Sequence, residues 1–339
     1  MSVRKIWLFV WINVLALLMV SCTGGKAIVQ ALSFLEFNER LAYRWAPIHS
    51  QDVDVTGGNG LEGKADYITN VDFDGDWNTL DNWENAPNHA LRAYAYYSVV
   101  ATSTHWFILY AFYHPRDWSD TPIVGGVDEH ENDLEGLLAI VKRPPIFSND
   151  GLGELLGIVT VCHNDFYSYT PSGSPLTDGE EDVDGTVNMK AFDGVLHPRT
   201  AQTSKSHCLK VPPYVRIEGG DGVIYFPKGY AQVPSGPNDR EVGYALVNIF
   251  IGEGMWERRG NAETFYGFGV FRGDNGKDNA AHAPWGWDDN DDGSKLTGGE
   301  LAIDPAKLVQ IYFNGLGDFS RVYTYNGYQD IGCDWPEGC

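Results

Sequence analysis

The stretch that decides the fold class is "AYAYYSVVATSTHWFILYAFYH", residues 93–114. It is rich in aromatic and β-branched residues, and it lacks the helical spacing of apolar positions. We expect two long strands here, or a hairpin that turns near Ala101–Ser103. This stretch and the strand-like runs that follow it, joined by turn residues, predict an all-β protein: a single β-sandwich with long loops and a few short helices. The further runs are "LEGLLAIVKR", "LLGIVTVCH", "CLKVPPYVRIEG", "GVIYFPKGY", "EVGYALVNIF" and "FYGFGVFRG".

Two segments have helical spacing instead. Residues 27–48 keep it up to Pro47, and "DPAKLVQIYFNGL" (304–316) begins with Asp304 as a cap and Pro305 in the first turn. No internal repeat occurs, and no linker is long enough to separate two domains. We therefore expect a signal peptide over 1–21, a lead-in helix and linker over 22–50, and one β-sandwich domain with inserted loops over 51–339.

The N-terminus has the pattern of an export signal. Arg4 and Lys5 precede an apolar run over 6–20, and Ser21 and Cys22 follow it. Small residues before a cysteine resemble a bacterial lipobox, which predicts that Cys22 is lipid-modified. An ordinary cleaved signal and an uncleaved anchor are the alternatives. The expected location is therefore the bacterial envelope, with the protein lipid-anchored at the outer membrane or cell surface.

The charge excludes some partners. The formal net charge is −22, and removal of Arg4 and Lys5 takes it to −24. So acidic a protein does not hold nucleic acid by counterion release, nor an anionic membrane by simple attraction. Cation binding or a highly solvated surface fits this composition better.

The cysteines predict structural crosslinks. With Cys22 set aside, four of the five cysteines remain, which allows three pairings in an exported protein. We expect Cys162 to pair with Cys208, and Cys333 with Cys339. His163 and His207 each adjoin a cysteine of the first pair, and we interpret both as structural.

A group of charges precedes the next apolar run. "DEHENDLEGLLAIV" (128–141) contains five carboxylates and a histidine. Alternate strand residues share a face, so Asp133 and Glu135 point the same way, with His130 in the loop before them. The preceding strand ends in His114 and Asp117, and consecutive strands usually pair.

Four candidate ligands therefore converge: Asp117, His130, Asp133 and Glu135. Three carboxylates with one imidazole suit a divalent cation such as Mg²⁺, Ca²⁺ or Mn²⁺. Neutralisation by the nearby basic residues is the alternative, and the geometry alone leaves both open. Those basic residues are Arg116, Lys142 and Arg143.

Residues 110–143, "YAFYHPRDWSDTPIVGGVDEHENDLEGLLAIVKR", resemble the central block of the necrosis- and ethylene-inducing peptide-like proteins. The resemblance implies a secreted β-sandwich that binds a divalent cation and attaches to the sugar headgroups of membrane sphingolipids. The family's metal-binding positions fall on the same four residues. A wider set of sandwich proteins, including vacuolar protein-sorting relatives, has a similar strand, so the block is more diagnostic of the fold than of the activity.

This sequence departs from the family's block at several positions. Glu129, Glu131, Asn132 and Leu134 replace its glycine, arginine, second histidine and tryptophan. The match spans only 34 of 339 residues. The chain therefore resembles a distant bacterial branch, and toxin activity does not follow from the resemblance.

Two further acidic stretches could hold calcium. Asp288, Asn290 and Asp292, followed by Gly293, repeat the first half of a calcium loop, without its final glutamate in place. "VDFDGDWNTLDNWEN" (71–85) alternates aspartates, and we interpret it as a solvated turn, with a calcium loop as the alternative.

Two tryptophans lie beside the first of these stretches. Trp285 and Trp287 could form a ligand-binding surface for a sugar, or they could fill the core.

Three functions remain in competition. The first is an exported lipoprotein whose divalent-cation site presents a surface for a polar ligand, either a glycan or a lipid headgroup. The second is a metal-dependent hydrolase of the envelope with Glu131 or His114 as base. The third is a structural envelope protein stapled by calcium. No residue stands out as a dedicated nucleophile, so we name no catalytic residue and favour the first function.

Overall fold

The computed structural model describes residues 24–124, 126–144, 151–213, 221–252, 254–277 and 280–331. Cys22, Cys333 and Cys339 lie outside these ranges. The chain divides into two compact units, Met1–Leu41 and Ala42–Cys339. None of the described helices is long and apolar enough to cross a membrane.

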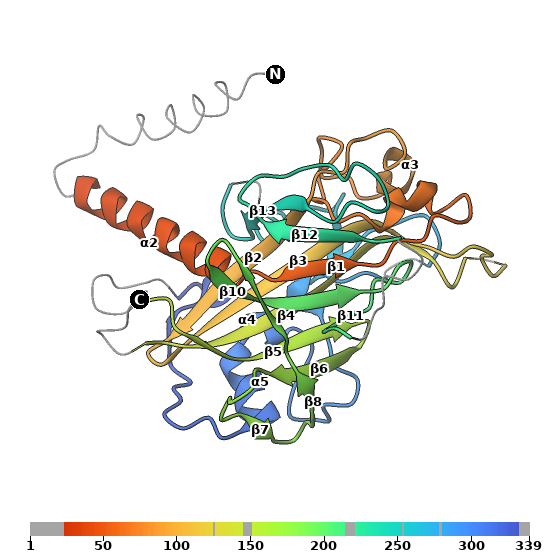
Figure 1. The fold of residues 1–339 in the computed structure, drawn as a ribbon. Helices are drawn as coiled ribbons and strands as arrows, with labels where there is room; N and C mark the ends of the chain where they lie inside the picture. The colour runs from red at the N-terminus through yellow and green to blue at the C-terminus, as the bar shows by residue number, and fades with distance from the viewer. Residues whose placement is uncertain are drawn as a thin grey trace. The chain divides into compact units, whose positions relative to one another are not determined.

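The elements confirm an all-β protein. The segment 93–114 forms two strands, and a tight turn joins them (Figure 1). The strands are β1 (Ile48–Gln51), β2 (Tyr94–Thr102), β3 (His105–Asp117), β4 (His130–Lys142), β5 (Glu154–Cys162), β6 (Asp165–Thr170), β7 (Thr177–Asp178), β8 (Val183–Thr186), β9 (Met189–Phe192), β10 (Val195–Gln202), β11 (Leu209–Lys210), β12 (Val223–Pro227), β13 (Val242–Asn248), β14 (Phe265–Gly267), β15 (Val270–Phe271), β16 (Phe313–Asn314) and β17 (Tyr323–Tyr325). The helices are α2 (Gly24–Trp45), η1 (Leu61–Asp66), α3 (Asn82–Asn85), η2 (Pro284–Gly286), α4 (Glu300–Ile303), α5 (Pro305–Tyr312) and η3 (Gly327–Gln329).

Both predicted helices are present. α2 ends at Trp45, just before Pro47, and β1 already begins at Ile48, inside the range expected to be a linker. α5 begins at Pro305, and the Asp304 side chain accepts a hydrogen bond from the Lys307 backbone N–H. The predicted strand after Cys208 is shorter than expected. It ends at Lys210, and the Pro212–Pro213 pair, which has no backbone N–H to donate, follows.

The main sheet is mixed and continuous. Its order is β11-β10-β1-β12-β13-β2-β3-β4-β5-β6-β8. The centre, β2 to β6, is an antiparallel meander, whereas β1–β10, β12–β13, β13–β2 and β6–β8 pair in parallel. The sandwich therefore forms because one sheet curls over itself, and β1, β10 and β11 pass in front of β3 to β5 (Figure 1).

The two long central strands are buried on both faces. All residues of β3 are buried. Leu109 and Tyr113 point into a core that the C-terminal segment completes with α5 and Trp285. On the other face, Phe112 stacks on His49 of β1, with ring centroids 4.1 Å apart. β11 contacts β4 and β5 on the same side. This double burial explains why residues 105–113 read as a nearly continuous apolar run rather than an alternating one.

Gly136 in the middle of β4 is required by this packing. A Cβ atom there would lie 2.1 Å from the Tyr110 carbonyl oxygen and 2.5 Å from the Trp287 ring. The indole of Trp287 therefore lies directly against the β4 backbone, where a side chain would displace it. The C-terminal segment is thereby fixed next to the polar end of β4.

Candidate metal centre

The register of β3 and β4 brings the predicted residues together. Asp117 lies opposite His130, His114 opposite Asp133, and Phe112 opposite Glu135. Asp117 Oδ2 is 3.2 Å from His130 Nε2. The expectation that the polar ends of these two strands meet is therefore correct, although His130 belongs to β4 itself and not to a preceding loop.

All four candidate ligands line one cavity of about 380 Å³. Its wall is mostly polar, and Trp287 and Leu134 contribute apolar surface. The other polar residues of the wall include Glu129, His163, Asn164, Ser206, Lys277 and His282. Side chains from β3, β4, the β5–β6 turn, the loop before β11 and the C-terminal segment thus surround one space.

Asn132 explains how His130 reaches this cavity. Strict alternation would place His130 and Asp133 on opposite faces, because they are three positions apart. Asn132 has a left-handed backbone with φ of 60°, which interrupts the alternation. Its buried side chain donates to the carbonyls of Thr79 and Arg272 and accepts from Asn82 and Tyr113. These four hydrogen bonds hold the backbone in its unusual conformation.

The imidazole of His130 faces a backbone carbonyl with one ring nitrogen and Asp117 with the other. Nδ1 lies 2.8 Å from the backbone oxygen of Asn132, and a carbonyl can only accept, so Nδ1 carries a proton. Nε2 therefore faces Asp117 either as a second donor or as a lone pair for a cation. Burial acts to lower the pKa of His130, but the hydrogen bond to Asp117 and the charge of Asp133 raise it to about 9. This arrangement, with Nδ1 donating to a carbonyl, is common for metal-binding histidines.

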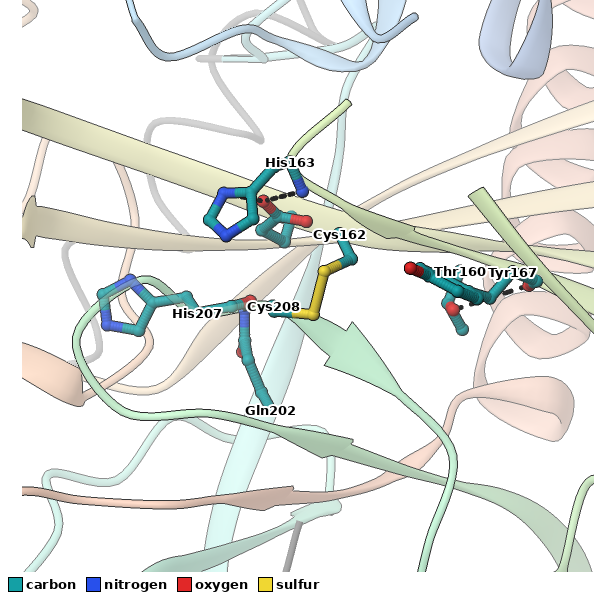
Figure 2. The surroundings of a disulfide bond; sticks show 8 residues. Thr160, Cys162, His163, Tyr167, Gln202, His207 and Cys208 are labelled. Atoms are coloured by element: carbon teal, nitrogen blue, oxygen red, sulfur yellow. Dashed lines mark hydrogen bonds and ion pairs between the residues drawn. A yellow bond between two sulfur atoms is a disulfide. The ribbon is translucent and has the colours of Figure 1, made fainter. Parts of the chain in front are cut away.

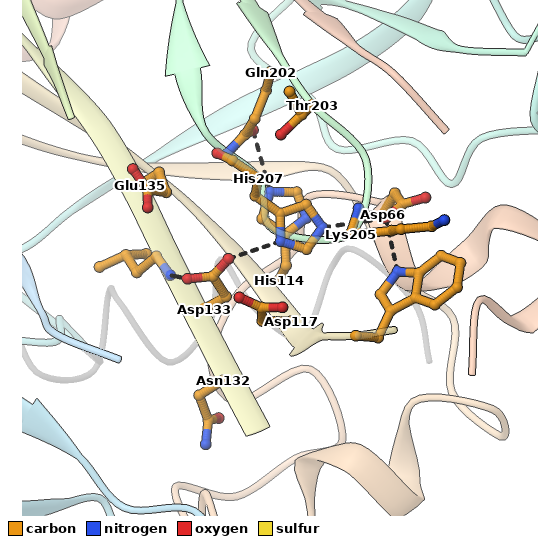
Figure 3. Close-up of polar contacts among 12 residues, drawn as sticks. Asp66, His114, Asp117, Asn132, Asp133, Glu135, Gln202, Thr203, Lys205 and His207 are labelled. Carbon is orange, nitrogen blue, oxygen red and sulfur yellow. Dashed lines mark hydrogen bonds and ion pairs between the residues drawn. The ribbon is translucent and has the colours of Figure 1, made fainter. Parts of the chain in front are cut away.

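His207 lies beside Asp133, a position that its place in the sequence did not reveal. His207 is fully buried, and its ring donates from Nδ1 to Asp133 Oδ2 at 2.8 Å and from Nε2 to Asp66 Oδ1 at 3.2 Å (Figure 3). Burial acts to lower the pKa of His207, but the two aspartates raise it to about 9. Burial alone would raise the pKa of Asp133, and the hydrogen bond from His207 lowers it. The ring also stacks on His114, with centroids 3.7 Å apart. The only sequence signal was adjacency to Cys208.

Glu135 carries an oxygen that no group among the described residues satisfies. Its Oε1 accepts from the backbone N–H of His163 at 2.8 Å, whereas its Oε2 is buried without a hydrogen-bond partner. Burial, together with the charge of Asp133, raises the pKa of Glu135 well above its usual value. A buried carboxylate oxygen without a donor is costly, and a bound cation would satisfy it.

The ligand atoms of the four predicted residues are not all close enough together to bind one ion. Among the described residues, three-ligand groups with atoms mutually within 4.8 Å are Asp74–Asp76–Asp81 and Glu84–Glu131–Asp274, and the predicted four form no such group. Asp117 and Asp133 are each bound to a histidine instead. Acidic groups able to hold a metal ion are therefore present. At the cavity, side chains would need to turn from their protein partners toward the ion.

Trp285 and Trp287 fill the core, which is the second of the two alternatives that the sequence left open. Trp285 is completely buried, and its ring packs edge-on against Trp256. Trp287 is also buried, and its Nε1 donates to the Leu134 backbone oxygen. Both rings therefore belong to the core, and Trp287 packs against the β4 backbone at Gly136. Only Trp287 also reaches the cavity wall.

The second candidate calcium loop stays a prediction. Asp288 and Asn290 are exposed, and Asp292 is half-buried. Burial, together with the charges of Asp288 and Glu300, raises the pKa of Asp292 to about 6. The aspartate that the structure buries is Asp289, which accepts hydrogen bonds from Tyr312 and from the backbone of Phe166.

The disulfide prediction is confirmed for Cys162 and Cys208, which are bonded (Figure 2).

The candidate bases of the hydrolase hypothesis do not face the cavity. His114 is buried with Nε2 next to Gln202, and Glu131 accepts from the backbones of Trp83 and Asp274. Neither residue lines the cavity wall.

Comparisons with known proteins leave the family open. No family model matches the chain, and no curated protein matches it. Solved structures similar to this one include the non-toxic HaNLP3 protein, with 12% identity and a TM-score of 0.31 over 62% of this chain and 73% of that one. NLPPya in complex with mannosamine has 15% identity and a TM-score of 0.30 over 51% of this chain and 66% of that one.

A third similar structure is Necrosis and Ethylene inducing Protein 2 from the causal agent of cocoa's Witches Broom disease. It has 16% identity and a TM-score of 0.26 over 50% of this chain and 66% of that one. The last two matches thus span slightly less than two thirds of the relatives' length. These structures are necrosis- and ethylene-inducing proteins, the family that residues 110–143 resemble, and the likeness is a distant one.

Proposed function

We propose that this protein is an exported, lipid-anchored β-sandwich protein whose cavity holds a divalent cation and presents it to a polar ligand. The observation that carries the proposal is the buried Oε2 of Glu135, which has no hydrogen-bond partner in the part of the chain that the structure describes and belongs to a residue of the cavity wall. Asp117, His130 and Asp133 line the same wall. A cation at this position would neutralise carboxylates that otherwise raise one another's pKa.

The donor set favours a hard or intermediate ion. Three carboxylates and one imidazole nitrogen suit Mg²⁺, Ca²⁺ or Mn²⁺ better than they suit zinc. His130 would bind through Nε2, since Nδ1 donates to a backbone oxygen. Such an ion keeps open coordination positions, because the protein supplies fewer ligands than it prefers.

The cavity fits a small polar ligand. A volume of about 380 Å³ lies within the range typical of small-molecule sites. Asn164, Ser206, Lys277 and His282 offer hydrogen-bonding groups, and Trp287 offers apolar surface. Vicinal hydroxyls of a sugar can bind both a divalent ion and such groups. A glycan, free or as a lipid headgroup, is therefore the ligand class that we propose.

The envelope location rests on the sequence of residues 1–22. A buried disulfide between Cys162 and Cys208 supports it, because disulfides persist mainly in oxidising compartments. In the native host, Cys22→Ser would shift the protein from the membrane fraction to the soluble exported fraction if Cys22 carries the lipid. Unchanged fractionation would contradict the lipid anchor and leave the cavity proposal intact.

Metal analysis of the purified protein is the central test. After dialysis against Mn²⁺ or Ca²⁺, the wild type should retain the ion, whereas Glu135→Gln and Asp133→Asn should retain much less. Glu154→Gln is the matched control, because Glu154 is an exposed carboxylate on the neighbouring strand β5. Equal metal content in all variants would refute the site.

Ligand retention separates presentation from a purely structural role. The wild type should bind members of a glycan or headgroup array, and a chelator should abolish that binding. A purely structural role of the cation predicts only a lower melting temperature with chelator. That role is supported by the group Asp74–Asp76–Asp81, which could also hold a metal ion. The two outcomes differ in whether a ligand is retained.

A further inference from the structure

Each cysteine of the disulfide is adjacent in sequence to a histidine that donates a hydrogen bond to a carboxylate of the candidate metal centre. Cys162 is followed by His163, whose backbone N–H donates to Glu135 Oε1 at 2.8 Å. Cys208 is preceded by His207, whose ring donates to Asp133 Oδ2 at 2.8 Å. Each cysteine is thus one residue away from a group that fixes one predicted ligand (Figures 2 and 3).

Both histidines have an unfavourable backbone conformation. The φ angles are 58° at His163 and 49° at His207. Residues other than glycine rarely adopt such angles, and they persist only where the surrounding structure fixes them. His163 is the first residue of a two-residue hairpin loop, because Cys162 pairs with Asp165 across it. A positive φ at that position is usually supplied by glycine.

The crosslink joins parts of the sheet that share no backbone hydrogen bonds. β5 lies near one end of the strand order and β11 at the other, and the cysteines are 46 residues apart in sequence. β11 meets β5 only because the sheet curls over itself. The disulfide, with a Cα–Cα distance of 4.3 Å, therefore fixes the distance between β5 and β11, which are not neighbours in the strand order.

We infer that the Cys162–Cys208 disulfide is a positioning crosslink for the metal centre. It holds His163 and His207 in their left-handed conformations and thereby fixes Glu135 and Asp133. Cation affinity of the folded protein therefore depends on the oxidation state of this pair. The inference rests on the proposed function, since it concerns the same four ligands.

The chemistry of reduction is balanced by a phosphine. The disulfide takes up two electrons and two protons and becomes two thiols, while phosphorus is oxidised to the phosphine oxide with oxygen from water. Once the bond is open, the β5–β6 turn and the loop before β11 can relax toward negative φ independently. The His163 N–H and the His207 ring then leave Glu135 and Asp133.

The test measures Mn²⁺ affinity of the full chain in three forms: oxidised, reduced with tris(2-carboxyethyl)phosphine and desalted without oxygen, and the double variant Cys162→Ala/Cys208→Ala. Circular dichroism first establishes that each form is folded. Both crosslink-free forms should bind Mn²⁺ at least about tenfold more weakly, the usual effect of losing groups that orient metal ligands. Phosphine treatment of the double variant should change nothing, because no disulfide remains.

The outcomes separate the two proposals. If the oxidised wild type binds no Mn²⁺, the proposed function fails and takes this inference with it. If the oxidised protein binds Mn²⁺ and the folded crosslink-free forms bind it equally well, the positioning role alone is overturned.

Two oxidised variants decide the matter if the crosslink-free forms do not fold. His207→Ala should weaken Mn²⁺ binding with the disulfide intact, and His207→Gln should restore part of it by donating to Asp133. Equal affinity of His207→Ala and wild type would overturn the inference.

Discussion

Asn132 provides the sharpest test of how the fold builds the cavity. Its left-handed backbone turns His130 toward Asp133, and its side chain makes four buried hydrogen bonds. At about 1 kcal/mol net for each bond, removal of the side chain should cost about 4 kcal/mol. Asn132→Gly loses these bonds but accepts the positive φ. Asn132→Ala loses the same bonds and adds about 1 kcal/mol of left-handed strain.

The assay is denaturant unfolding of wild type, Asn132→Gly and Asn132→Ala, with Mn²⁺ titration of each folded form. We expect stability to fall in that order, and Mn²⁺ affinity to fall most in the alanine variant, where the backbone can relax and turn His130 away. A glycine variant less stable than the alanine variant would refute the backbone argument. If the free energy of unfolding of both variants lies within about 0.5 kcal/mol of wild type, the effect is no larger than that of an ordinary surface substitution. That result would refute the stabilising role of the four hydrogen bonds.

Three further predictions concern other parts of the molecule. Burial lowers the pKa of His49 to about 3, below its unfolded value, so its contribution to stability is present above about pH 6.5 and is lost as the pH falls toward 3. Below about pH 6.5, the free energy of unfolding should therefore fall less steeply with decreasing pH in His49→Gln than in wild type, by up to about 1.4 kcal/mol per pH unit. His89 is partly exposed, and His89→Gln is the control. The same slope in both variants would contradict this prediction. Gly136→Ala should lower the free energy of unfolding by about 1–3 kcal/mol through overpacking and change the near-ultraviolet dichroism of Trp287. The control Gly185→Ala, whose Cβ would lie 3.6 Å from its nearest neighbour, should change neither. Equal melting temperatures of the two variants would contradict the overpacking at Gly136. Mn²⁺ at about 100 times its Kd should raise the free energy of unfolding by about 2.7 kcal/mol, reversed by chelator; a melting temperature independent of Mn²⁺ would argue against a site specific to the folded state.

Local sequence was enough to predict the elements and the pairing at the centre of the sheet. The apolar runs of residues 93–114 and 134–141 have the composition of strands, and consecutive strands are usually neighbours. That predicted that the polar ends of the two strands meet, and the structure supplied the register that pairs Asp117 with His130 and His114 with Asp133. The same local logic predicted α5 from Asp304 and Pro305, because a cap acts within one turn.

Only the tertiary structure decided what completes the cavity and what lies outside it. Strand periodicity could not show that Asn132 turns His130 around, because a positive φ at that residue depends on partners far along the chain. His207 meets Asp133 across 74 residues, and Trp287 is buried where the C-terminal segment packs against β4. Sequence spacing governs neighbours along a strand, whereas the folding of one curled sheet onto itself determines which distant side chains share a buried space.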